Sequence, residues 1–127
     1  MSEYQRAQDE WDRIWMQFHQ GLARNPGRLY RHQIIKQLVI SNSRDESKLI
    51  VDMGCGTGEL LSYLAKDIGI QNLLGLDISK VGILKAQEKF PNLNFGLIEI
   101  NEFELHSRSI QSRAGIIVCS EVLEHLE

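Results

Sequence analysis

Three glycines at alternate positions, Gly54, Gly56 and Gly58, follow a short apolar run and precede a stretch with helical spacing. A strand that leads through such a turn into a helix presents free backbone N–H groups and the positive end of the helix dipole. Glycine permits the tight turn, and its missing Cβ lets a ligand lie against the backbone. The pattern predicts a binding loop, although a purely structural glycine turn has the same spacing.

An acidic residue, Asp77, ends the next apolar run along the chain. In doubly wound folds an acidic side chain at this place accepts hydrogen bonds from ribose hydroxyls. Ser79 can cap the helix that follows, which would leave Asp77 free for a ligand. The glycine loop and Asp77 together predict a ligand of the nucleoside type.

The charges beside the loop narrow the choice of nucleoside. The fingerprint of dinucleotide-binding loops requires a further glycine at the position of Glu59. The carboxylates of Asp52 and Glu59 would repel a pyrophosphate, whereas they would attract an amino group or a sulfonium. This argument favours S-adenosylmethionine over NAD, and a dehydrogenase is the less favoured reading.

Alternating apolar and helical segments must position this loop. Strands are predicted at residues 48–53, 72–77, 93–97 and 115–119, and helices over about 58–67 and 79–89. Leu60, Leu61 and Leu64 face inward in the first of these helices. The alternation predicts an α/β fold with a Rossmann-like, doubly wound parallel sheet, truncated after its fourth strand.

Two further helices are predicted before the first strand. The first covers residues 3–20, and its aromatic stripe of Trp11, Trp15 and Phe18, with Ile14, favours packing or a lid over a substrate cage. The second begins at Asn25-Pro26. Its buried face is expected to contain six apolar residues: Leu29, Tyr30, Ile34, Ile35, Leu38 and Val39. A basic cluster shares this region and fits a solvated face better than a phosphate site: Arg24, Arg28, Arg31 and His32.

Residues 52–58 resemble motif I of the class I S-adenosylmethionine-dependent methyltransferases, residues 75–79 their motif II, and residues 116–126 their fourth motif. The resemblance covers residues 48–127. It departs from the family at Glu99, where members often have Asp, and at Ala114-Gly115, where they commonly have Phe-Asp.

The resemblance implies a set of contacts to S-adenosylmethionine. Gly54, Gly56 and Gly58 would line its methionine part, and Asp52 would lie near its amino group. Asp77 would bind the ribose hydroxyls, and Ile78 would pack on adenine. Glu99, near the adenine amine, and Ser120, in the fourth motif, complete the expected cofactor site.

Glu121, Glu124 and His125 could share one helical face and hold a divalent metal. Small-RNA terminal 2′-O-methyltransferases resemble this pattern, but so do ubiquinone-type O-methyltransferases. We expect no metal here. The pattern leaves a metal-assisted RNA methyltransferase as one alternative function, and a non-catalytic nucleotide-binding module as another.

The composition, with 43% hydrophobic residues and a net charge of −3, is that of a cytoplasmic globular protein. The weak negative charge favours a small-molecule methyl acceptor over nucleic acid, and no apolar run could span a membrane. Cys55 and Cys119 are expected to be buried, reduced thiols. The acceptor and the general base stay unidentified.

The chain is expected to divide into two parts, an N-terminal helical segment over residues 1–45 and a cofactor-binding domain over residues 46–127. Because only four strands are predicted, we expect the domain to be incomplete at its C-terminal end. We also expect the 127 residues alone to lack methyltransferase activity.

Overall fold

A computed structural model describes residues 1–17, 26–98, 112–120 and 122. Helices α1 (Glu3–Gln17) and α2 (Pro26–Asn42) precede strand β1 (Leu49–Met53) and helix α3 (Glu59–Leu64). A 3₁₀ helix, η2 (Ile70–Asn72), leads into β2 (Leu73–Asp77), α4 (Lys80–Lys89), β3 (Asn94–Leu97) and β4 (Ala114–Val118). The predicted helices and strands are all present, although α3 is shorter than expected.

The four strands form one parallel sheet in the order β3-β2-β1-β4. Asp52 of β1 is paired with Gly75 of β2, and Asp77 of β2 with Leu97 of β3. Because the strands are parallel, their carboxyl ends and the loops after them meet at one edge of the sheet. The Rossmann-like α/β fold is confirmed.

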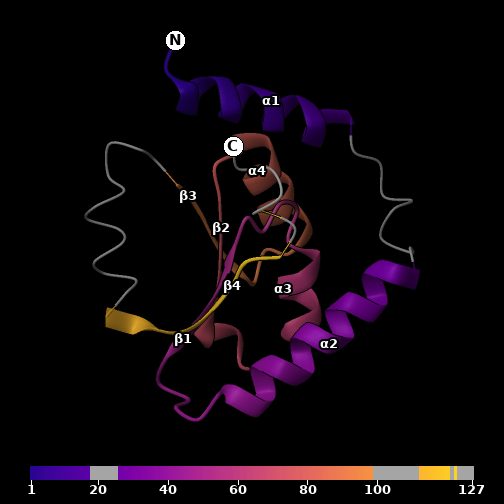
Figure 1. The fold of residues 1–127 in the computed structure, drawn as a ribbon, viewed down its shortest axis with the longest axis vertical. Coiled ribbons are helices and arrows are strands. Elements are labelled where there is room, and N and C mark those ends of the chain that lie inside the picture. The colour runs from indigo at the N-terminus through magenta and orange to yellow at the C-terminus, as the bar shows by residue number, and fades with distance from the viewer. Residues whose placement is uncertain (18–25, 99–111, 121, 123–127) are drawn as a thin grey trace.

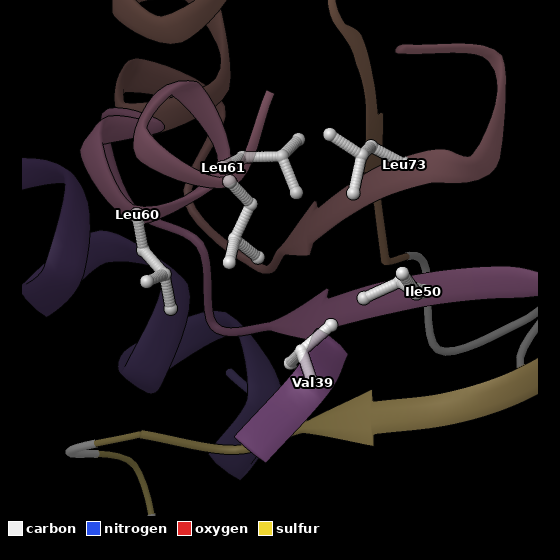
Figure 2. Close-up of a cluster of buried hydrophobic side chains, with 6 residues drawn as sticks. Val39, Ile50, Leu60, Leu61 and Leu73 are labelled. Carbon is white, nitrogen blue, oxygen red and sulfur yellow. The ribbon is translucent and has the colours of Figure 1, made fainter. Parts of the chain in front are cut away.

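One apolar cluster joins the sheet to α2 and α3 (Figure 2). Leu61 and Leu64 are completely buried in it, as the helical spacing predicts. Ile50 of β1 and Leu73 of β2 pack against them from the sheet. The neighbouring strand residues Leu49 and Val51 belong to a second cluster with Leu76, because successive strand side chains point to opposite faces.

The buried face of α2 is narrower than predicted. Val39 is buried and Ile35 is half-buried, but four of the six expected residues are 40–64% exposed: Leu29, Tyr30, Ile34 and Leu38. The helix rests on the stripe that runs through positions 28, 32, 35 and 39, which share one side of a helix. The inward face is therefore part polar and part apolar.

The first helix also differs in detail from the prediction. Trp11 and Trp15 are half-buried, while Ile14 is 42% exposed and lies outside the stripe. Figure 1 shows α1 beside α4, and α2 alongside α3. In the described part of the chain, no helix is both long enough and apolar enough to cross a membrane.

The two cysteines have different environments. Cys55 is buried, whereas Cys119 is exposed. The prediction of a buried thiol is wrong for Cys119, because this residue follows β4, which lies at the edge of the described sheet and alternates between half-buried and exposed positions.

Candidate cofactor site

A cavity of about 490 Å³ lies at the carboxyl edge of the sheet. Its floor consists of lining residues from the strand ends, the loops after them and α3: Asp52, Met53, Gly54, Cys55, Gly56, Leu60, Asp77, Ile78, Ile98, Ser120 and Val122. Its roof consists of lining residues from α1 and α2: Ala7, Trp11, Trp15, Arg28 and His32.

The glycine loop is the centre of the floor. Gly54, Gly56 and Gly58 all have positive φ angles, of 77°, 54° and 86°, which residues with a Cβ adopt only with strain. The backbone N–H groups of Gly54 and Cys55 donate to the Leu76 carbonyl at 2.7 and 3.0 Å. These bonds attach the loop to the end of β2.

The three glycines have different surroundings. Gly54 and Gly56 line the cavity, and a Cβ on Gly56 would collide with the Trp15 ring. Gly58 is not among the lining residues, and a Cβ there would meet the Phe95 ring at 2.7 Å. Its left-handed conformation starts α3, so Gly58 shapes the turn and the packing beneath it.

Asp77 makes two hydrogen bonds within the floor. One carboxylate oxygen accepts from the Gly56 N–H at 2.8 Å and the other from the Ser79 N–H at 2.9 Å. Ser79 does cap α4, since its hydroxyl accepts from the Gly82 N–H at 3.0 Å. Although Ser79 provides the cap, the Asp77 carboxylate already accepts from two backbone N–H groups, because the chain turns back over it after β2.

The ionisation of Asp77 reflects these contacts. Burial raises its pKa, and the N–H groups of Ser79, Gly56 and Ile78 oppose that shift. A carboxylate has about four lone-pair sites. Asp77 therefore keeps the capacity to accept further hydrogen bonds from hydroxyl groups in the cavity.

Asp52 contrasts with Asp77. It is 3% exposed, lines the same cavity, and its carboxylate makes no hydrogen bond with any described residue. Burial, with the nearby negative charge of Asp77, raises the pKa of Asp52 to about 7. A buried carboxylate without a partner favours a ligand that brings a hydrogen-bond donor or a positive charge.

The other acidic side chain of the loop, Glu59, has a structural role. Glu59 accepts from the Thr57 hydroxyl at 2.5 Å and pairs with Lys89 at 3.2 Å, and it does not line the cavity. Burial opposes its ionisation, but these partners hold the pKa of Glu59 below its usual range. Of the two acids invoked against a pyrophosphate, only Asp52 faces the ligand space.

Cys55 also lies in the floor. Burial, together with the negative charges of Asp52 and Asp77, raises the pKa of its thiol above the usual range. A thiol in this environment stays protonated and is a poor nucleophile.

Helix α1 is fastened over the cavity by polar side chains. The Gln8 amide donates to the Ile78 carbonyl at 2.8 Å. Asp12 accepts from the Ser79 hydroxyl at 2.5 Å and from the Val81 N–H at 3.1 Å, and Lys85 donates to the Trp15 carbonyl. These contacts place the Trp15 ring against the glycine loop.

The structure brings most of the predicted cofactor residues to one cavity. Six of the eight line it: Asp52, Gly54, Gly56, Asp77, Ile78 and Ser120. Gly58 lies behind the loop. Glu99 and the metal candidates Glu121, Glu124 and His125 are outside the described residues. Among the residues that are described, no three His, Cys, Asp or Glu side chains are grouped to hold a metal ion.

The lining residues that were not predicted as site residues include two pairs in the roof: Trp11 with Trp15, and Arg28 with His32. Each pair is spaced i, i+4 on its helix, which places both members on one face. That spacing was the available signal, but it does not say which face of a helix meets a cavity.

Comparison with known proteins identifies the family. Residues 51–127 match a methyltransferase-domain family model. The chain is 32% identical over 85 residues to a ubiquinone biosynthesis O-methyltransferase of Hydrogenovibrio crunogenus, covering 64% of this chain and 33% of the relative. It is 43% identical over 68 residues to a trans-aconitate 2-methyltransferase of Deinococcus radiodurans, covering 53% and 26%. The chain thus spans about a third or less of these relatives.

Solved structures share the fold. A magnesium protoporphyrin IX methyltransferase from Synechocystis PCC 6803 with bound S-adenosylmethionine superposes with a TM-score of 0.60 at 18% identity, covering 100% of this chain and 65% of that one. An S-adenosylmethionine-dependent methyltransferase from Anabaena variabilis gives a TM-score of 0.64 at 16% identity, covering 94% and 48%. The family match shows that the chain belongs to the methyltransferase-domain family, and these structures show that it shares the fold of S-adenosylmethionine-dependent methyltransferases.

Proposed function

We propose that the floor binds S-adenosylmethionine and that the protein transfers its methyl group to a small molecule. The observation that carries this proposal is the Asp52 carboxylate, which is buried, faces the cavity and has no hydrogen-bond partner among the described residues. The amino group of a methionine moiety supplies the missing donor and charge. When bound, the cofactor supplies an activated methyl group on a sulfonium.

The chain's own residues would hold the cofactor along the floor. Asp77 would accept from the ribose hydroxyls with its remaining lone pairs, and Ile78 and Ile98 offer apolar surface for adenine. Gly54 and Gly56 leave room for the methionine part, and Ser120 offers a hydroxyl at the end of β4. The protein's contribution to the transfer would be alignment and exclusion of water.

The two-part organisation belongs to the same proposal. Residues 46–127 would supply the floor, and residues 1–45 would supply the roof that covers it. The polar fastening of α1 to residues 78–81 supports this role, because a helix that merely filled space would be attached by apolar contacts.

A small-molecule acceptor is supported by the names of the two relatives. One is a trans-aconitate 2-methyltransferase, and the other is an O-methyltransferase of ubiquinone biosynthesis. The half-buried aromatic and basic side chains of the roof suit a compound with both apolar and polar parts.

Titration calorimetry of the chain tests the cofactor assignment. We expect S-adenosylmethionine and S-adenosylhomocysteine to bind and NAD to bind weakly or not at all. Tighter binding of NAD would contradict the proposal. For the acceptor, labelled methyl transfer by the whole protein should appear on small organic acids or phenols, and transfer only to RNA or protein would exclude the small-molecule class.

A further inference from the structure

The Trp15 indole packs against two glycines that belong to different elements. A Cβ on Gly56 of the glycine loop would lie 2.4 Å from Cζ2 of this ring, and a Cβ on Gly82 of α4 would lie 3.2 Å from Cδ1. One end of the indole therefore contacts the glycine loop, and the other end contacts the first turn of α4. The absence of a side chain at both positions lets the ring approach the two backbones this closely.

The glycine within α4 has no role in a turn. Gly82 is buried in the helix, where glycine is less favourable than alanine. A Cβ at this position would meet the Trp15 ring and would also lie 3.4 Å from the Gly56 carbonyl oxygen. The helix thus loses some intrinsic stability at Gly82 and gains room for the indole, so the place of this ring is a specific feature of the fold.

The same ring belongs to the wall of the cavity. Trp15 and Trp11 both line it, and their rings are stacked with centroids 6.5 Å apart and planes inclined by 29°. Lys85 of α4 donates to the Trp15 carbonyl and holds the backbone of α1 at this point. Because Trp15 is half-buried and lines the cavity, part of its surface is open to a ligand.

The proposed cofactor carries two positive charges, an α-ammonium and a sulfonium. Asp52 suits the ammonium, which donates hydrogen bonds. A sulfonium sulfur has no hydrogen to donate, whereas the negative face of an aromatic ring attracts a cation without any hydrogen bond. Gly56, assigned to the methionine part of the cofactor, is also the residue that the Trp15 ring contacts.

We propose that the Trp15 ring, with Trp11 stacked beside it, recognises the sulfonium charge and so distinguishes S-adenosylmethionine from S-adenosylhomocysteine. The inference rests on the proposed function and adds a residue that determines specificity. The two ligands share the adenosine, the ammonium and the carboxylate, and they differ only in the methyl group and the charge on sulfur. A wall that prefers the charged form would favour release of the demethylated product.

Titration calorimetry of both ligands with wild type and Trp15→Leu tests this proposal. Leucine keeps an apolar contact but has no aromatic face, so the ratio of the two dissociation constants should shift by about threefold to tenfold toward S-adenosylhomocysteine. Trp15→Phe, which keeps a smaller ring, should shift the ratio less. Met16→Leu is the matched control at the next, 58% exposed position of α1, and it should change neither affinity.

Fluorescence gives a second readout that does not require Trp15→Leu to fold. Trp11→Phe leaves Trp15 as the single tryptophan of the chain. Saturation with S-adenosylmethionine should change its emission more than saturation with S-adenosylhomocysteine. Equal emission changes, or an unchanged affinity ratio in a folded Trp15→Leu, would overturn the inference and leave the proposed function intact. A wild-type chain that binds neither ligand would instead remove the proposed function, and this inference with it.

Discussion

The floor and the roof of the cavity are held in place by different kinds of contact. In the floor, backbone groups of residues 54–56 bond to the neighbouring strand end, at Leu76 and Asp77. In the roof, side chains of Gln8 and Asp12 reach backbone and hydroxyl groups about 70 positions away in the sequence. Local chain geometry shapes the floor, whereas long-range polar contacts place the roof.

The comparison extends to charge. The two floor carboxylates, Asp52 and Asp77, are buried beside one another, and the pKa of each is raised by burial. The basic side chains that line the cavity come from the roof. The burial of two carboxylates in the floor is electrostatically unfavourable, and a cationic ligand would reduce this penalty. The roof supplies positively charged side chains.

The largest effect on cofactor binding is expected from Gly56→Val, which disturbs both the floor and the roof of the cavity. The position has a φ of 54°, and a Cβ there would collide with the Trp15 ring. We expect no measurable binding of S-adenosylmethionine by calorimetry. Gly69→Ala is the control, since Gly69 has a φ of −58° and its Cβ would meet only the flexible Gln71 side chain. Normal binding by a folded Gly56→Val would refute the cavity assignment.

The second-largest effect on cofactor binding is expected from Asp77→Ala. Loss of the ribose hydrogen bonds and of the acceptor for the Gly56 N–H should weaken cofactor binding by roughly 1.5–3 kcal/mol. Asp77→Asn keeps one acceptor oxygen and should weaken it less. Ser79→Ala, which removes the cap of α4 and the hydrogen bond to Asp12, should lower the melting temperature but reduce the affinity only a few-fold. Equal losses of cofactor affinity in Asp77→Ala and Ser79→Ala would show that Asp77 supports binding only by holding the backbone of the loop and makes no contact with the ligand.

The pH dependence of cofactor binding tests the contribution of the Asp52 carboxylate. Its pKa of about 7 means that the ionised form, which attracts an ammonium, grows as pH rises through 7. Between pH 6 and 7, where an α-amino group is still mostly protonated, the affinity should rise by up to about fivefold. Calorimetry across this range should show the rise in wild type and a flat profile in Asp52→Asn.

The stability of the ligand-free protein should follow the opposite course. Because the pKa of Asp52 is raised from 3.8 to about 7 on folding, the folded state holds more protons than the unfolded state between these values. The free energy of unfolding should therefore fall as pH rises from about 4 to 7. Urea denaturation would measure this, and a wild-type slope no steeper than that of Asp52→Asn would contradict the burial argument.

The smallest effect is expected from Asp12→Ala in the roof. The Ser79 hydroxyl and the Val81 N–H would lose their acceptor, which should cost about 1 kcal/mol of unfolding free energy. Cofactor affinity should fall only a few-fold, because the floor stays intact. Tryptophan fluorescence during urea denaturation follows Trp11 and Trp15 directly. Glu10→Ala, at an exposed site on the same helix, is the control and should change neither quantity.

Most of the floor could be predicted from the sequence. Strand, glycine turn and capped helix follow one another within a few residues, so apolar spacing and turn chemistry are enough to place Gly54, Gly56 and Asp77. The bond that Asp77 accepts from the Gly56 N–H could not be predicted, because it depends on two adjacent strand ends that only the sheet brings together.

The roof could be predicted only as two helices. Helical period locates an amphipathic segment but does not say which of its faces meets other elements. On α2 the structure exposes Leu29 and Leu38 and turns Arg28 inward, because Ile35 and Val39 dock on the apolar cluster and the residues one turn earlier must follow them.

The sequence by itself determined the alternation of strands and helices, the glycine loop, the Ser79 cap and the membership of a cofactor-binding family. These features depend on local propensity and on residues that are neighbours in the chain. Tertiary structure alone decided that Asp52 is buried with no hydrogen-bond partner among the described residues, while Glu59 is paired with Lys89. It also decided that Arg28 and the two tryptophans line the cavity, since burial and charge environment depend on elements that the chain brings together only when it folds.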